Sequence, residues 1–281
     1  MVLEARWRHV SRETFLWYSR SQVRGEQMNK IIALANQKGG VGKTTTAVNL
    51  AAALAEAGRH VLAVDFDPQG NLTSGFGIEK DRVENTAYEV VMGQCSVEDV
   101  LQKTYSDRLD VIPSNVNLSG AEIELLDREN RENILKNCLE PVRKKYDYIL
   151  IDCPPSLSIL TVNAMTAATS VLIPIQCEYY AMEGLNQMMR SIQLVRKKLN
   201  PELQIEGIVF TMYDARNNLS QQVVDSVKEA LHEHIFQTMI SRNVRAAEAP
   251  SYGLPVTEYD PRSSGAENYR KLAAELIELE D

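Results

Sequence analysis

The fold of this 281-residue chain is decided by Lys38-Gly39-Gly40-Val41-Gly42-Lys43-Thr44-Thr45. This stretch follows an apolar run at residues 31–35 and precedes an alanine-rich segment, so it predicts a strand, a glycine-rich loop and a helix. In such a loop the backbone N–H groups point into one concavity, with the positive end of the helix dipole behind them. The phosphates of a nucleotide fit that environment. We expect Lys43 to neutralise phosphate oxygens and the Thr44 hydroxyl to bind Mg²⁺.

Short apolar runs alternate along the chain with longer segments of helical length. The runs lie at residues 31–35, 61–64, 109–112, 148–151, 170–175 and 205–211, and the longer segments at 44–57, 120–140, 158–168, 181–199, 221–234 and 265–279. Strands that are apolar on both faces are typical of a parallel sheet covered by helices. The pattern predicts a doubly wound α/β fold with a mostly parallel sheet and helices on both faces, whose ligands bind at the carboxyl ends of the strands. Residues 75–107 are expected to form helix and loop over one edge.

Aspartates end two of these runs. Asp152 follows residues 148–151, and we expect it to hold Mg²⁺ through a water from a strand tip beside the glycine loop. Asp65 and Asp67 follow residues 61–64 within the sequence DFDPQGN. For each of these carboxylates the alternative is a simple turn at the end of a strand, because Asp-Pro and Gln-Gly are also common in turns.

Gln37 stands five positions before Gly42, where the common phosphate loop has a glycine. The loop instead reads K-G-G-x-G-K-T-T, which resembles the deviant Walker A motif of the ParA/MinD family of P-loop ATPases. In that family the early lysine, here Lys38, reaches across a dimer interface to the nucleotide of the partner subunit. The resemblance therefore implies ATP and Mg²⁺ as ligands and a homodimer formed with ATP. Gly39 and Gly40 fit such an interface, because two loops that meet across a nucleotide leave little space for side chains.

Further segments resemble the ParA/Soj branch of the family, from about residue 28 to the last helical segment. The DFDPQGN segment implies that Asp67 orients or deprotonates the attacking water and that Asp65 lies near the Mg²⁺ shell. Residues 208–219 resemble a strand and loop that close over adenine and lead to a DNA-binding surface, which implies that Met212 contacts the nucleotide and Arg216 the DNA. Residues 242–255 resemble the family block R-N-V-R-x-x-E-A-P-S-x-G-x-P and add Arg242 and Arg245. Residues 241 and 246–247 depart from the usual proline and leucine-serine of that block.

The resemblance implies an ATPase that binds double-stranded DNA non-specifically as a dimer and drives chromosome or plasmid segregation. The implied partner is a ParB/Spo0J-like protein whose basic N-terminal peptide stimulates hydrolysis. The formal net charge of −8 does not predict DNA binding, so the basic residues must cluster when two subunits pair. The candidates are Arg216, Arg242 and Arg245, with Lys228 and Arg270 as further options.

Three other functions share the same glycine loop. A MinD-like membrane ATPase needs a basic amphipathic C-terminal helix, whereas this chain ends in the acidic sequence AAELIELED, so we expect no stable membrane association. A nitrogenase-reductase-like electron carrier needs cluster-binding cysteines, and Cys153 and Cys177 do not stand in that family's sequence settings. An ATPase that positions another protein cargo is the alternative that the sequence separates least well.

The first 27 residues differ from the rest of the chain, with five arginines and both tryptophans. We interpret them as a mis-assigned start before Met28, a disordered or loosely docked arm, or a basic segment for membrane or nucleic acid. Residues 28–281 are then expected to form a single ParA-like ATPase domain. The four cysteines are scattered, and no apolar run approaches the roughly 18 residues of a membrane span. These features favour a cytoplasmic protein, which the resemblance places on the nucleoid.

Overall fold

The computed structural model describes residues 29–231 and 233–280, so the N-terminal arm expected at residues 1–27 lies outside the described part. Within it, seven strands form one sheet in the order β3-β4-β2-β5-β1-β6-β7. All pairings are parallel except that of β3 with β4. The strands are β1 (Lys30–Leu34), β2 (Val61–Asp65), β3 (Gln102–Lys103), β4 (Leu109–Ile112), β5 (Tyr148–Asp152), β6 (Ser170–Gln176) and β7 (Gln204–Thr211).

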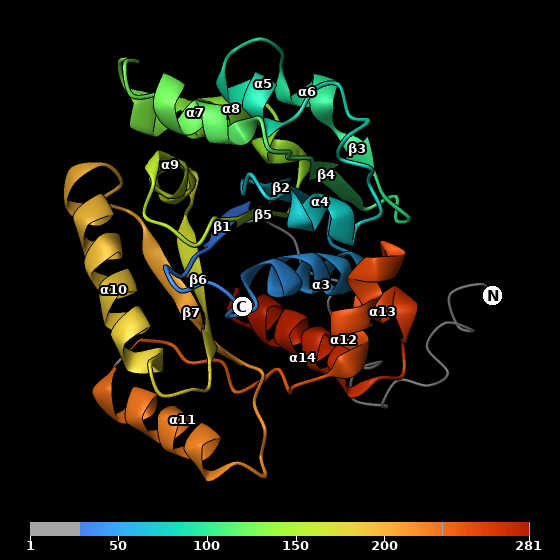
Figure 1. The fold of residues 1–281 in the computed structure, drawn as a ribbon, viewed down its shortest axis with the longest axis vertical. Helices are drawn as coiled ribbons and strands as arrows, with labels where there is room; N and C mark the ends of the chain where they lie inside the picture. Colours follow the sequence, from blue (N-terminus) through green and yellow to red (C-terminus); the bar gives the residue numbers. More distant parts are fainter. Residues whose placement is uncertain (1–28, 232, 281) are drawn as a thin grey trace.

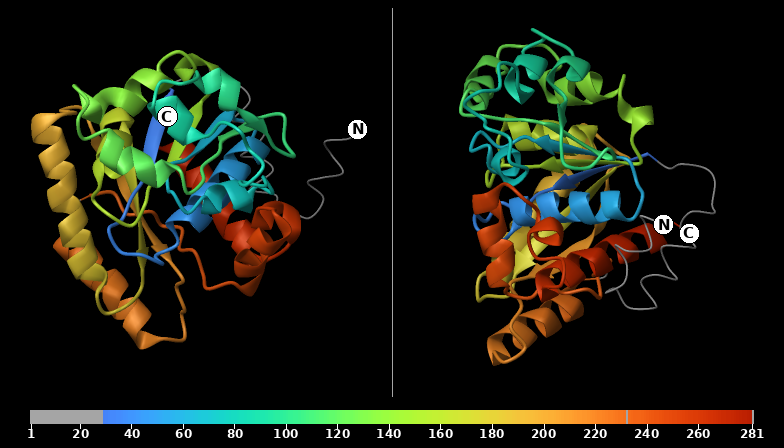
Figure 2. Two further views of the ribbon diagram at one scale, coloured as in Figure 1. Left: turned by 45° about the horizontal axis from the view of Figure 1, so that its top comes forward. Right: turned by 90° about the vertical axis from the view of Figure 1, so that its right-hand side faces the viewer.

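Helices cover both faces of this sheet (Figure 1), and Figure 2 shows the sheet between two helical layers. One face carries α3 (Lys43–Glu56), α4 (Asn71–Gly75), α12 (Val244–Glu248), η3 (Ala249–Tyr252), α13 (Val256–Tyr259) and α14 (Ser264–Glu278). The other carries α5 (Ala87–Val91), α6 (Val97–Val100), α7 (Leu118–Glu124), α8 (Ile134–Leu139), α9 (Ile159–Ala167), α10 (Ala181–Lys198) and α11 (Asn218–Ala230). The short turns η1 (Arg131–Asn133) and η2 (Arg143–Lys145) flank α8.

Two hydrophobic cores follow from the alternation of side chains along the strands. On β5, Tyr148 and Leu150 pack into the core that contains α3 and α14, whereas Ile149 and Ile151 pack into the core on the opposite face. Successive side chains of a strand point to opposite faces, so a strand that is apolar throughout must be covered on both sides. The doubly wound α/β fold predicted from the sequence is therefore confirmed.

The helix expected over residues 120–140 is wrong as a single segment. Helix α7 ends at Glu124, and η1 and α8 follow after a turn at Asn130. Asn130 has φ 51°, in the left-handed region that asparagine tolerates better than most residues, and this conformation breaks the helix. Helix α11 begins three residues before the expected position because the Asn217 side chain accepts a hydrogen bond from the Leu219 N–H and caps it. Residues 75–107 contain α5 and α6 as expected, together with the short edge strand β3, which was not predicted.

No helix in the described residues is long and apolar enough to cross a membrane. All four cysteines lie in the described part and are free thiols.

Candidate active site

The glycine loop joins the end of β1 to the start of α3. Gly40 and Gly42 have φ values of 75° and 83°, which glycine adopts without strain. No side chain caps α3 at its N-terminus, and its first turn holds no acidic residue. The N-terminal N–H groups of a helix have no partners within the helix, and the helix dipole favours an anion there. The loop therefore presents free donors where a phosphate group would bind.

Lys43 begins α3 and is only 6% exposed. Its Nζ donates a hydrogen bond to the Lys38 carbonyl oxygen at 3.3 Å, which turns the ammonium back over the loop. Burial lowers the pKa of Lys43, and the carboxylates of Asp152 and Asp67 act in the opposite direction. The ammonium therefore lies close to both carboxylates.

Asp152 ends β5 and has the features of a magnesium-binding carboxylate. Both of its side-chain oxygens are buried, and within the described residues neither makes a hydrogen bond of normal length and angle, although the Thr44 hydroxyl lies close by. Burial and then the neighbouring Asp65 raise the pKa of Asp152 well above its usual range, while the Thr44 hydroxyl and Lys43 act in the opposite direction. A buried carboxylate without partners is costly, and a cation bound through a water would satisfy it. Asp152 and Thr44 therefore fit Mg²⁺.

Asp65 lies opposite Asp152 in the pairing of β2 with β5. Its Oδ2 accepts hydrogen bonds from the Thr73 N–H at 2.8 Å and the Thr73 hydroxyl at 2.6 Å, and its Oδ1 accepts one from the Asp67 N–H at 3.3 Å. Burial raises its pKa to about 6, against the effect of these hydrogen bonds. In this structure Asp65 thus fixes α4 and the backbone of Asp67. Sequence reasoning missed Thr73. The one feature that could have indicated it is its position just after DFDPQGN, in a short helix.

Asp67 is 6% exposed and lies in a tight turn. Its Oδ1 accepts a hydrogen bond from the Gln69 N–H at 2.9 Å, and its carbonyl oxygen accepts one from the Ser114 hydroxyl at 2.9 Å. Ser114 follows β4, so the neighbouring strand also fixes this turn. Sequence reasoning missed Ser114 because no local pattern marks it.

Lys38, the early lysine that marks this loop as the deviant type, is held within its own chain. Its ammonium forms an ion pair with Glu178 and lies 5.6 Å from the centre of the Tyr180 ring. The Lys38 N–H donates to the Asn36 side chain at 3.0 Å. Beside it, the Gln37 side chain donates to the Ser191 hydroxyl of α10 at 2.7 Å. The unusual residues of the loop therefore anchor it to the segment that begins after β6.

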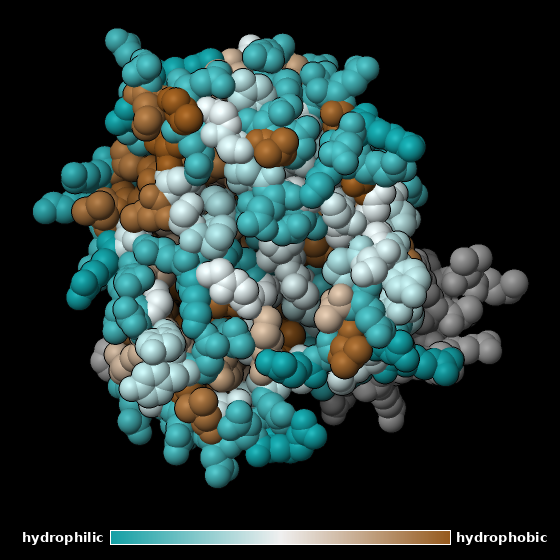
Figure 3. Space-filling view, in the orientation of Figure 1, coloured by the Kyte–Doolittle hydropathy of each residue, from teal (hydrophilic) through white to brown (hydrophobic). Residues whose placement is uncertain are grey.

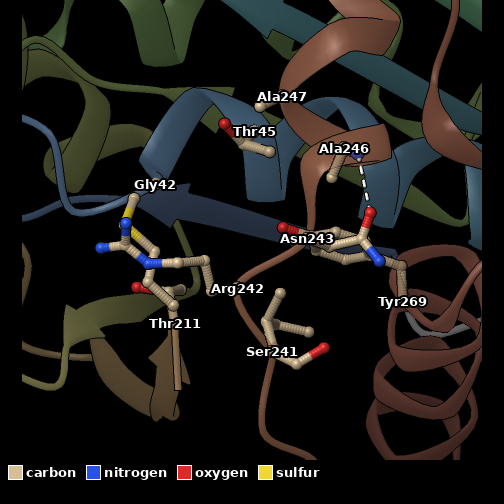
Figure 4. A pocket seen from close by; sticks show the side chains of 11 residues that line it. Gly42, Thr45, Thr211, Ser241, Arg242, Asn243, Ala246, Ala247 and Tyr269 are labelled. Atoms are coloured by element: carbon tan, nitrogen blue, oxygen red, sulfur yellow. Dashed lines mark hydrogen bonds between the residues drawn. The ribbon is translucent and has the colours of Figure 1, made fainter. Parts of the chain in front are cut away.

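A cavity of about 220 Å³ opens beside the loop, between the end of β7 and the start of α12 (Figure 4). Thr45, Met212 and Tyr269 are among its lining residues. Met212 has φ 51°, an uncommon conformation for a residue other than glycine. The Thr211 hydroxyl donates to the Val41 carbonyl oxygen at 2.8 Å and so joins this wall to the glycine loop. A mostly apolar cavity next to a phosphate-binding loop has the right position for a nucleobase.

The basic residues expected on a DNA-binding surface have different surroundings. Arg216 is 90% exposed and forms two 2.9 Å hydrogen bonds with Asp214, whose pKa this contact lowers to about 2. Arg245 pairs with Glu248 at 3.0 Å and with Asp260 at 3.4 Å. Arg242 lines the cavity, Lys228 is exposed on α11, and Arg270 is largely buried in a pair with Glu56. The structure does not bring all five together.

Comparisons with known proteins agree with this geometry. The profile of a family described as "AAA domain" matches residues 29–205. The chain is 56% identical over 249 residues to the sporulation initiation inhibitor protein Soj of Bacillus subtilis, which covers 89% of this chain and 98% of that protein. It is 49% identical over 262 residues to the chromosome partitioning protein ParA of Myxococcus xanthus, which covers 93% of each.

A solved structure is similar over most of its length. Cobyrinic acid a,c-diamide synthase from Mycobacterium smegmatis, with bound ADP and magnesium, has a TM-score of 0.78 and 38% identity, covering 88% of this chain and 93% of that one. The sequence relatives, the family profile and the fold lead to the same assignment. The chain therefore belongs to the ParA/Soj family of P-loop ATPases.

Proposed function

We propose that this ATPase forms a homodimer with ATP, binds DNA without sequence preference, and releases it after hydrolysis to drive chromosome or plasmid segregation. ATP and Mg²⁺ are its ligands, and residues 28–281 form its ATPase domain. The observation that carries the proposal is the meeting of the glycine loop, Asp152 and Asp67 around the buried ammonium of Lys43. For this function, the protein would be located in the cytoplasm and associated with the nucleoid.

The residues of the loop bind and position the nucleotide. The free N–H groups at the start of α3 and the Lys43 ammonium bind phosphate oxygens, while Met212 and the cavity beside it hold the base. Thr44 and Asp152 hold Mg²⁺, with Asp65 behind them. When bound, the ion neutralises charge that develops on the phosphates during transfer.

Asp67 orients the attacking water and accepts its proton. Its Oδ1 is bound to the Gln69 N–H, and its Oδ2 accepts none of the hydrogen bonds found in the described part of the chain. The contacts with Asp65 and Ser114 fix its backbone. A carboxylate with one oxygen held and one free is suited to align a water for in-line attack.

DNA binding is assigned to Arg216 and Arg245. Both are exposed, and each is paired with a carboxylate of its own chain. A DNA phosphate would therefore replace an existing ionic partner. The favourable binding free energy would come largely from the counterions that DNA releases. Binding of this kind is weak for one subunit, strengthens when a dimer doubles the contacts, and falls steeply with salt.

A ParB/Spo0J-like protein is the proposed partner. Figure 3 shows apolar side chains gathered over the part of the molecule where α7, α9 and α10 lie. Ile123 on α7 is 73% exposed and Leu126 just beyond it is 49% exposed. Glu124, Asp127 and Glu129 are exposed in the same segment. An apolar surface bordered by carboxylates suits a basic amphipathic peptide, the type of segment that the family resemblance attributes to this partner.

The experiment that tests the proposal is retention of the protein on a random-sequence duplex with ATP, ADP or no nucleotide. Wild type is compared with Lys38→Ala and Arg216→Ala, and Arg82→Ala is the control, since Arg82 is exposed and pairs only with Glu79 among the described residues. We expect retention only with ATP and its loss in both test variants. If wild type forms ATP-dependent dimers but is not retained in any nucleotide state, the function moves to a MinD-like membrane ATPase or an ATPase that positions protein cargo.

A further inference from the structure

Arg242 differs from the two arginines assigned to DNA. Arg216 and Arg245 form ion pairs with carboxylates of their own chain. Among the residues that the structure describes, the Arg242 guanidinium has neither an ion pair nor a hydrogen bond. Its charge acts on Asp214, but both oxygens of that carboxylate accept hydrogen bonds from Arg216, so the N–H groups of Arg242 remain available to a ligand.

The backbone places Arg242 beside the nucleotide cavity. The Tyr213 N–H donates to the Ile240 carbonyl oxygen at 3.0 Å, and the Arg242 N–H donates to the Tyr213 carbonyl oxygen at 3.1 Å. These bonds hold residues 240–242 alongside the end of β7, where Thr211 contacts the glycine loop. The position of Arg242 is thus tied to the wall of the cavity.

The side chain lies on the phosphate side of that cavity. Arg242 lines it together with Gly42, Thr45 and Thr211, and Figure 4 shows its guanidinium directed toward the side where Gly42 and Thr211 lie. Gly42 precedes the helix N-terminus that is assigned to the phosphates, whereas Tyr269 lies at the other end of the view. A guanidinium here can bind phosphate or ribose oxygens with more than one N–H group, or stack on a base.

We propose that Arg242 is a nucleotide-binding residue, which contacts ATP and ADP at the phosphate side of the base cavity, and that it is not a DNA contact. This inference rests on the proposed placement of the nucleotide, but it does not depend on DNA binding. Because the contact is made with the bound nucleotide in both states, Arg242 contributes to affinity more than to the rate of the chemical step.

The test measures nucleotide affinity and DNA retention separately in the full chain. A fluorescent ADP analogue with Mg²⁺ is titrated into wild type, Arg242→Gln, Arg242→Lys and the control Arg82→Gln. We expect Arg242→Gln to weaken binding by about tenfold, as for a charge-assisted hydrogen bond near a surface. Arg242→Lys should recover part of the affinity, and the ATPase should show a raised KM with little change in kcat.

DNA retention is then measured at saturating ATP, with Arg216→Gln for comparison. Retention of Arg242→Gln close to the wild-type level, with a matching thermal unfolding midpoint, supports the inference. Unchanged affinity for the ADP analogue overturns it, and loss of retention together with that unchanged affinity assigns Arg242 to the DNA surface. If wild type itself is not retained on DNA, the proposed function fails, while the nucleotide titration still decides the role of Arg242.

Discussion

Lys38 forms an ion pair with Glu178 of its own chain and lies over the ring of Tyr180. The proposed role of Lys38 is to contact the nucleotide of a partner subunit, and one ammonium cannot satisfy both arrangements. If the proposed dimer forms, Glu178 therefore competes with it for Lys38. Two such pairs must open for each dimer that forms.

Replacement of Glu178 should strengthen the dimer. The side chains of Lys38 and Glu178 are 32% and 33% exposed, and a pair of this kind contributes at most about 1 kcal/mol. Since two pairs open, we expect Glu178→Gln to tighten ATP-dependent dimerisation by roughly 2- to 30-fold. Sedimentation with ATP and with ADP measures this, and Glu183→Gln on the neighbouring helix is the matched control. A weaker dimer would mean that Glu178 contributes to the interface instead.

Gly39→Val should separate nucleotide binding from dimerisation. A Cβ at Gly39 would meet only Pro155 Cβ within 4 Å, at 3.9 Å, so the chain itself has room for a side chain. Valine at Gly40 would also strain the backbone, because φ there is 75°, so an effect on dimerisation could not be separated from an effect on the loop itself. We expect Gly39→Val to bind an ADP analogue like wild type but to remain monomeric with ATP. ATP-dependent dimers of this variant would show that the two loops do not meet closely.

Asp152→Asn should stabilise the nucleotide-free protein while removing its response to Mg²⁺. The carboxylate is buried and makes no hydrogen bond of normal geometry with the described residues, and its raised pKa shows that the fold disfavours the charged form. A neutral side chain of the same shape avoids that cost, which is about 1–3 kcal/mol for an unsatisfied buried group. We expect a thermal unfolding midpoint a few degrees above wild type, with little further increase on adding Mg²⁺ and ADP.

The exposed Asp225→Asn serves as the control for this experiment. A lower midpoint for Asp152→Asn without nucleotide would show that the carboxylate, through Lys43, stabilises the fold. A full response to Mg²⁺ and ADP would exclude Asp152 from the metal site.

The contribution of Glu280 to stability should depend on pH. Burial is the main cause that raises the pKa of Glu280 above its ordinary value of 4.5, while the hydrogen bond from the Tyr148 hydroxyl acts in the opposite direction. The folded state then holds the proton more tightly than the unfolded state, so ionisation of Glu280 reduces stability as the pH rises from about 4.5 through the folded pKa. Glu280→Gln removes this loss.

Urea unfolding of wild type and Glu280→Gln at several pH values measures the difference. The stability of the variant relative to wild type should increase as the pH rises above about 4.5, and should level off once the pH exceeds the raised pKa of Glu280 in the folded state. A relative stability that falls over the same range would show that the charged form of Glu280 is favoured, through Arg59 and Lys30.

The sheet was predictable because its strands carry their own signal. Four consecutive apolar residues in β5, followed by Asp152, favour a strand that is buried on both faces, so its position followed from this short stretch of sequence alone. The break between α7 and α8 was not predictable, because a left-handed turn at Asn130 leaves the helical character of the flanking residues intact. The glycine loop and the strand-end aspartates could be predicted because their functional residues are neighbours in the sequence and directly follow recognisable strands.

The contacts that position these groups could not be read from the sequence. Glu178 lies far along the chain from Lys38, and Ser114 lies 47 residues from Asp67. Neither belongs to a local pattern, since strand order and not sequence distance brings them together. For the same reason the sequence grouped Arg242 with Arg216 and Arg245, although the pairing along β7 turns it to the cavity.

The alignment of the central strands limits which insertions and deletions the protein can accept without loss of the metal site. Asp65 and Leu34 both lie level with Asp152, so β1, β2 and β5 end at the same height. Loss of one residue inside β5 would turn Asp152 to the opposite face and move it away from Thr44, because side chains alternate along a strand. Loops away from the nucleotide site can change length, but these strands, the glycine loop and the turn at Asp67 cannot. Length variation among descendants of this gene should therefore collect in segments such as residues 126–130 and be absent from residues 148–152.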